Sequence, residues 1–198
     1  MTRTPAAYRG PRAAWHRVST RVYGPRGGCE GFSWVPGERL AIGGIPRAGE
    51  ITALPGHGFT HLVVCRATPQ TRLSQDLWAA RQVLGHEHVA HADMWDDGKP
   101  KDPALWAPAA LFAARAIQED PEARVLVHCQ QGRRRSVFVA YATLRLLGHS
   151  EDDAARMVLE ARPMGKLVPA YRESVERWLA ERDAEGLPSR HPDPPAVR

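Results

Sequence analysis

The sequence predicts an α/β domain whose central sheet is largely parallel and is flanked by helices. Two observations carry this prediction. Short, mostly apolar runs, typical of strands buried on both faces, alternate along the chain with segments in which apolar residues recur at helical spacing. Chains that alternate strands and helices in this way build parallel sheets, because each helix returns the chain to the start of the next strand. The strand runs are residues 39–42, 61–65, 88–92 and 124–128.

The helices are marked by apolar stripes and by start signals. Asp102 followed by Pro103 suits a helix start, and we expect that helix to run to about Gln118. Ser150 and Asp153 form a capping box for a later helix. The expected inward residues of the five helices are, in order, Leu73, Leu77, Ala80 and Leu84; Leu105, Ala109, Phe112 and Ala116; Val137, Ala140, Leu144 and Leu147; Ala154, Val158 and Ala161; and Val168, Tyr171, Val175 and Trp178.

One domain accounts for most of the chain. We expect it to span residues 14–185, because residues 1–13 and 186–198 show no core pattern and are predicted to be disordered tails. The hydrophobic content of 43% is enough for a core. No run approaches the roughly 20 apolar residues of a membrane span, and the N-terminus lacks the apolar run of a secretory signal, so we expect a cytoplasmic location. The sequence does not indicate an oligomeric state.

Charge and cysteine content argue against several classes of site. The net charge of +5 comes from basic residues spread over the whole chain, so we expect no stable complex with nucleic acid. Cys29, Cys65 and Cys129 contain no C-x-x-C pair, which argues against a disulfide framework and a zinc site. The histidines within residues 86–91 would point to different sides of a strand and would not converge. We therefore expect neither a metal nor a cofactor.

The most informative segment joins the strand at 124–128 to the helix that follows it. Cys129 lies at the carboxyl end of that strand, where parallel sheets bind ligands, and a tight turn at Gly132 leads into the helix. Backbone N–H groups of such a loop make an anion-binding nest, which would also stabilise a thiolate on Cys129. Arg135 can hold two phosphate oxygens with its planar fork, and the Ser136 hydroxyl can donate a hydrogen bond to the sulfur. The expected phosphate-binding residues are Gln130, Gln131, Gly132, Arg133, Arg134 and Arg135.

These residues resemble the protein tyrosine phosphatase superfamily, and within it the dual-specificity group. The family signature H-C-x5-R-[S/T] is met by His128, Cys129, Arg135 and Ser136. The resemblance extends over residues 39–178 and implies a dual-specificity phosphatase-like fold. It also implies catalysis by Cys129 as nucleophile through a cysteinyl-phosphate, with an aspartate as general acid.

The family takes its acid from a loop some thirty residues before the cysteine, where this sequence offers three candidates. Asp97 lies 32 residues before Cys129 and precedes Gly98, so it is our first choice. Asp96 and Asp93 remain alternatives. Cys65 ends a strand predicted to lie near that of Cys129. It is either an ordinary buried cysteine or, as in some members of the superfamily, a second thiol that pairs with the oxidised nucleophile.

The sequence thus leads us to expect a phosphatase acting on protein phosphotyrosine, and also on phosphoserine or phosphothreonine. Arg133 and Arg134 keep other substrates open: they either add positive charge for a phosphoinositide, an inositol phosphate or an RNA 5′ phosphate, or are solvated or paired with acids such as Asp96. An inactive phosphate-binding module is the alternative from another class.

Overall fold

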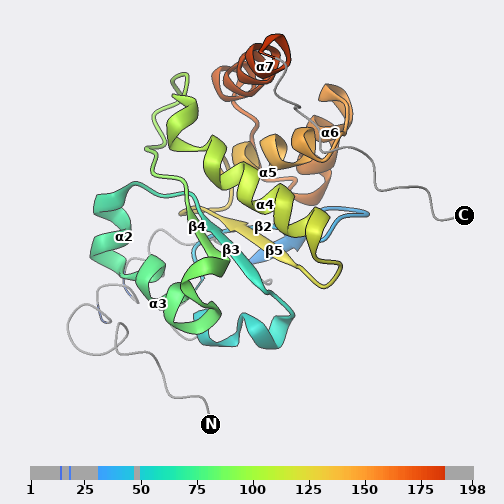
Figure 1. Ribbon diagram of the computed structural model, residues 1–198. Helices are drawn as coiled ribbons and strands as arrows, with labels where there is room; N and C mark the ends of the chain where they lie inside the picture. Colours follow the sequence, from blue (N-terminus) through green and yellow to red (C-terminus); the bar gives the residue numbers. More distant parts are fainter. Residues whose placement is uncertain (1–13, 15–17, 19–30, 47–49, 186–198) are drawn as a thin grey trace, which may run out of the picture.

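In the part of the chain that the structure describes, five strands form one sheet in the order β1–β2–β5–β3–β4, seen near the centre of the ribbon in Figure 1. The computed structural model describes residues 14, 18, 31–46 and 50–185 of the chain. The strands are β1 (Phe32–Trp34), β2 (Leu40–Gly43), β3 (His61–Val64), β4 (Val89–His91) and β5 (Val125–His128). All neighbouring strands are parallel except β1, which runs antiparallel to β2 at the edge. The expected α/β architecture is therefore confirmed, and β1 is a strand that the sequence did not predict.

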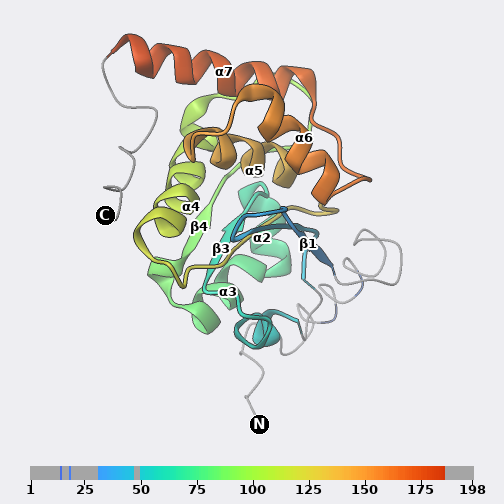
Figure 2. The ribbon, with the colours of Figure 1, turned by 90° about the vertical axis from the view of Figure 1, so that its right-hand side faces the viewer.

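Helices cover both faces of this sheet. The α-helices are α2 (Thr68–Ser74), α3 (Asp76–Leu84), α4 (Ala107–Glu119), α5 (Arg135–Leu146), α6 (Glu151–Ala161) and α7 (Pro169–Ala184). Short 3-10 turns are η2 (Ile51–Ala53), η3 (Pro55–His57), η4 (His86–His88) and η5 (Pro103–Leu105). Figures 1 and 2 both show α4, α5, α6 and α7 stacked on one side of the sheet, with α3 on the other. None of the helices in the described residues is long and apolar enough to cross a membrane.

The alternating side chains of β5 divide the core into two layers. Val125 and Val127 pack in the cluster under α4–α7, while Leu126 packs with Ala79 and Ala80 of α3 on the opposite face. This alternation follows from the two-residue period of a strand. Because β5 lies between β2 and β3, its carboxyl end is held on both sides.

The predicted helix over Leu73–Leu84 is wrong in one respect, because two helices occupy this segment. Gln75, with φ of 57°, lies in the left-handed region, so the backbone turns between α2 and α3. Leu73 therefore faces solvent, and it is 55% exposed.

The helix expected from Asp102 also begins differently. Asp102 caps the turn η5 through its side chain, and α4 begins only at Ala107 after the fully buried Trp106. This break changes the phase of the apolar stripe, so Leu105 is exposed and Ala109, with its neighbours on α4, forms the inner face.

The other helices agree with their predicted patterns. Ser150 accepts a hydrogen bond from the N–H of Asp153 and caps α6, whose Ala154, Val158 and Ala161 are buried. The inward residues of α5 are also buried, apart from Leu147, which lies just beyond its end and is half-buried. The predicted tails at 1–13 and 186–198 lie outside the described residues.

Candidate active site

A loop of residues 129–134 joins the carboxyl end of β5 to the N-terminus of α5. Gly132 adopts a φ of +68°, and a Cβ at this position would lie 2.6 Å from the Gly43 carbonyl carbon and 2.7 Å from the Gly44 nitrogen. The loop therefore curls against the end of β2, and only glycine fits. The N–H of Ile45 donates to the carbonyl of Gln130 over 3.3 Å, which fixes the loop at a second point.

Cys129 lies at the bottom of this loop and is 2% exposed. Burial by itself would raise the pKa of its thiol. The positive charge of Arg135, the hydroxyl and N–H of Ser136 and the N–H of Arg133 outweigh that effect and lower the pKa of Cys129 below its usual value. The Ser136 hydroxyl donates to Sγ over 3.3 Å. The nucleophile predicted from the sequence is thus set among donors that favour its thiolate form.

Arg135 is the first residue of α5 and is almost fully buried. Its Nη1 donates to the side-chain oxygen of Gln70 over 2.8 Å and to the carbonyl of Met94 over 3.1 Å. Within the described part of the chain, its buried Nε has no hydrogen-bond partner. A buried guanidinium with an open donor beside a thiolate is suited to bind the oxygen of an anion.

Two further residues support the loop from outside it. Arg162 is buried, donates from Nε to the carbonyl of Gly132 over 3.2 Å and reaches the Ser33 hydroxyl over 3.1 Å. The N–H of Lys166 donates to the carbonyl of Arg133 over 2.6 Å. The segment after α6 therefore braces the loop.

The loop opens onto a pocket of about 310 Å³. Its lining residues are Asp96, Cys129, Gln130, Gln131, Arg133, Arg134, Arg135 and Lys166. The structure thus brings all of the predicted phosphate-loop side chains to one pocket, with Gly132 behind them and Ser136 beneath Cys129. Lys166, Gln70 and Arg162 come from other segments. No local pattern in the sequence marks Lys166 or Gln70 as part of the site.

The three candidate acids lie in different surroundings. Of these, only Asp96 lines the pocket; its Oδ1 accepts from the Tyr171 hydroxyl over 3.2 Å and lies 3.1 Å from Nη1 of Arg134. Asp97 instead pairs with Lys101 and accepts from the N–H of Lys99, and these contacts lower the pKa of its carboxyl.

Asp93 points toward the start of α2. It accepts from the N–H and hydroxyl of Thr68 over 2.7 and 2.5 Å. Burial opposes the ionised form of this carboxyl, but the hydrogen bonds from Thr68 outweigh it and lower its pKa. The placement of the three side chains therefore differs from the order expected from spacing alone, because Asp97 turns toward Lys101 and away from the pocket.

The loop that carries these acids is held by the last helix. The Tyr171 hydroxyl accepts from the N–H of Gly98 over 3.0 Å, and the Ser174 hydroxyl accepts from the N–H of Lys101 over 2.9 Å. Both residues lie on α7. Tyr171 was expected only as a core residue, and the structure adds a polar contact to the acid loop.

Cys65 follows β3 directly, and its N–H donates to the carbonyl of His128 over 2.7 Å. Val64 is paired with His128 in the parallel register, so Cys65 and Cys129 leave the sheet side by side. Both thiols are free, and burial together with the nearby Cys129 raises the pKa of Cys65 well above its usual value. Cys29 lies outside the described residues.

The histidines at 86–91 do not lie on one strand, because His86–His88 form the 3-10 turn η4 and only His91 lies on β4. The ring of His91 contacts the carbonyl of Arg66, and that of His88 contacts the carbonyl of Leu84. In the described ranges, no group of three or more His, Cys, Asp or Glu side chains is placed to hold a metal ion.

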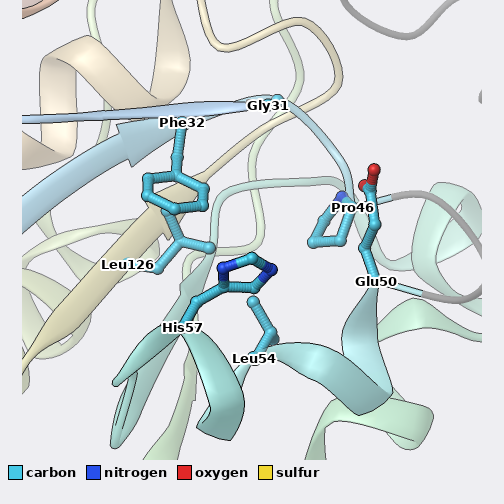
Figure 3. Close-up of a pocket in the computed structure, with 8 residues that line it drawn as sticks. Gly31, Phe32, Pro46, Glu50, Leu54, His57 and Leu126 are labelled. Carbon is cyan, nitrogen blue, oxygen red and sulfur yellow. The ribbon is translucent and has the colours of Figure 1, made fainter. Parts of the chain in front are cut away.

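A second cavity, shown in Figure 3, shares no lining residue with the first. It is mostly apolar and lies between β1 and the turns η2 and η3. Phe32, Leu54 and Leu126 line it together with the ring of His57, while the carboxylate of Glu50 lies at its margin. The rings of Phe32 and His57 meet edge to face at 5.8 Å.

The chain matches no protein-family model and no curated protein. Its backbone, however, is similar to several solved phosphatase structures. A variant of human DUSP28 is 25% identical, with a TM-score of 0.61, over 79% of this chain and 99% of that one. PTPMT1 in complex with PI(5)P is 16% identical, with a TM-score of 0.67, over 79% and 99% of the two chains. Tk-PTP in its active form is 24% identical, with a TM-score of 0.60, over 77% and 97%. The chain therefore has the fold of the dual-specificity phosphatases of the protein tyrosine phosphatase superfamily, as its signature implies.

Proposed function

We propose that this protein is a metal-independent phosphatase that hydrolyses phosphomonoesters through a cysteinyl-phosphate. One observation carries the proposal: a cysteine with a lowered pKa shares a pocket with a buried arginine whose Nε is open to a ligand. The solved phosphatases with the same fold support it. If the protein were instead an inactive phosphate-binding module, the lowered pKa of Cys129 would have no role.

The first chemical step transfers the phosphoryl group to sulfur. The Cys129 thiolate attacks phosphorus, the bond to the leaving oxygen breaks, and a carboxylic acid gives that oxygen its proton. Arg135 and the loop N–H groups hold the equatorial oxygens, where charge is greatest in the transition state.

The second step releases inorganic phosphate. The carboxylate formed in the first step accepts a proton from water as the water oxygen attacks phosphorus and the S–P bond breaks. Ser136 donates its hydrogen bond to the departing sulfur, which lowers the cost of its negative charge.

The geometry supports Asp96 as the acid in place of Asp97. Asp96 shares the pocket with Cys129, and its carboxylate lies beside the hydroxyl of Tyr171. Asp97 has a lowered pKa because Lys101 and Lys99 stabilise its anion, and a lowered pKa makes a carboxyl a poorer proton donor at neutral pH.

Three variants test this function with an aryl phosphate as substrate. Cys129→Ser should abolish turnover while phosphate still binds, and full activity in that variant would end the proposal. Asp96→Asn should lower kcat by about 100-fold or more, the usual contribution of a general acid. Asp97→Asn is the matched control and should lower it far less; the reverse order would restore Asp97 as the acid.

Two substrate classes follow from the sequence and the pocket. Protein phosphotyrosine is what the family resemblance implies, with phosphoserine and phosphothreonine as further targets. A phosphorylated inositol is favoured by the lining of the pocket, in which the described residues place no aromatic side chain on which a phenyl ring could pack. PTPMT1, whose structure holds PI(5)P, shows that a phosphatase of this fold binds such a headgroup.

A further inference from the structure

The mouth of the pocket carries more positive charge than one phosphate group needs. Four of its lining side chains are cationic, Arg133, Arg134, Arg135 and Lys166, and one is a carboxylate. Arg135 is committed to the phosphate beside Cys129, and Arg134 forms an ion pair with Asp96. Arg133 and Lys166 are the two cations left without either of these partners.

These two cations are exposed and lie on neighbouring segments. The backbone of Lys166 donates to the carbonyl of Arg133 over 2.6 Å, and Nε of Arg133 donates to the carbonyl of Met164 over 3.2 Å. Neither side chain forms an ion pair with an acid anywhere in the described ranges. Two like charges that line one pocket without a counter-charge of their own attract an anion.

We propose that Arg133 and Lys166 form a second anion subsite, which binds another phosphate group of the substrate while its scissile phosphate lies on Cys129. The inference rests on the proposed phosphatase function and specifies its substrate as a polyol ring that carries at least two phosphates, such as the headgroup of a phosphoinositide or a free inositol phosphate. The remaining lining side chains fit such a ring, since Gln130 and Gln131 offer amides that hydrogen-bond to hydroxyl groups. Phosphotyrosine, with an apolar ring and one phosphate, would leave both the amides and the two cations without partners.

Binding to the Cys129→Ser protein separates this subsite from catalysis. Calorimetry should give a Kd for soluble inositol bisphosphate about tenfold or more below that for inositol monophosphate, as expected when a further charge-assisted contact forms. Adding Arg133→Gln or Lys166→Gln should reduce that preference by about five- to tenfold, while Arg133→Lys, which keeps the charge, should retain most of it. High salt should weaken the preference because both cations are exposed.

Arg124→Gln is the matched control. It removes the same charge from an exposed arginine at the amino end of β5, the opposite end of the strand from Cys129. The preference for the bisphosphate should not change in this variant. Equal loss in Arg124→Gln would mean that general surface charge, and no defined subsite, attracts the ligand, and the proposal would be overturned.

Turnover by the unaltered protein then reports on function and on the source of the ligand. Hydrolysis of an aryl phosphate without any preference for bisphosphates would support the phosphatase function and refute the second anion subsite. A preference for binding bisphosphates without turnover of any substrate would support the second anion subsite and refute the phosphatase function. Faster hydrolysis of phosphatidylinositol bisphosphate in phosphatidylcholine vesicles than of the soluble headgroup supports a lipid substrate, and the opposite result supports a free inositol phosphate. A phosphotyrosine peptide hydrolysed faster than both would overturn the proposal.

Discussion

Replacing Gly132 by alanine tests whether the phosphate loop depends on its close approach to β2. The substitution has two costs. A non-glycine residue in the left-handed region costs about 1–2 kcal/mol, and φ here is +68°. The new Cβ would also lie 2.6–2.8 Å from backbone atoms of Gly43 and Gly44, well inside the roughly 3.5–4.0 Å of a comfortable contact. Because those atoms lie at the carboxyl end of β2, which is paired with a strand on each side, the loop itself must move, which adds about 1–3 kcal/mol.

We therefore expect Gly132→Ala to lower the free energy of unfolding by about 2–5 kcal/mol, measured by urea denaturation. The shift of the loop should also displace the N–H groups around Cys129 by a sizeable fraction of an ångström. A misplacement of about 1 Å can cost about 100-fold in rate, so kcat/KM for an aryl phosphate should fall by up to that factor.

Gly37→Ala separates the two costs. Gly37 has a φ of +77°, but nothing lies within 4 Å of the Cβ that alanine would add. This variant should lose only the 1–2 kcal/mol of backbone strain and keep its activity. Equal effects of the two substitutions on stability and on kcat/KM would refute the claim that Gly132 is required by contact with β2.

Three further predictions concern the site and the core. Activity should rise with pH as Cys129 loses its proton, and because the pKa of Cys129 is lowered, the acid limb of kcat/KM should lie below the usual thiol pKa. Ser136→Ala removes a hydrogen-bond donor to Sγ and should move that limb to higher pH. The same variant should alkylate more slowly at Cys129 at neutral pH. Gln70→Ala removes the side chain that holds Nη1 of Arg135, so kcat/KM should fall by about tenfold with little change in melting temperature; an unchanged rate would show that the Met94 carbonyl alone is enough. Trp106→Ala should cost about 3–5 kcal/mol in urea denaturation, because this side chain is completely buried between the rings of its neighbours, and a loss under 1 kcal/mol would contradict the packing described here.

The parts of the fold that the sequence predicted are those that local chemistry determines. β5, the loop after Cys129 and the helix α5 are encoded by an apolar strand, one glycine and an apolar helix in direct succession. Ser150 capped α6 as expected because a capping box involves only residues three apart.

The failures arise where distant segments decide the outcome. No glycine or proline marks the break between α2 and α3, because the residue that adopts the left-handed conformation there is a glutamine, Gln75. β1 is three residues long and exists through pairing with β2, which no local pattern reveals. The identity of the acid stays a prediction, but the surroundings of the candidates also depend on distant segments: Asp97 pairs with the buried Lys101, and Asp96 meets Tyr171 from a helix some seventy residues later.

The contacts of α7 with the acid loop have a consequence for the order in which activity can arise during synthesis. Domains form as the chain leaves the ribosome, N-terminal segments first. The nucleophile and its loop are complete once α5 has been made, whereas Tyr171 and Ser174, which hold the backbone around Asp96, are among the last residues of the domain to emerge. A nascent or truncated chain that ends before Pro169 would contain the phosphate loop without the two side chains that hold the segment around Asp96. Under the proposed mechanism, activity would therefore require the completed C-terminal helix α7.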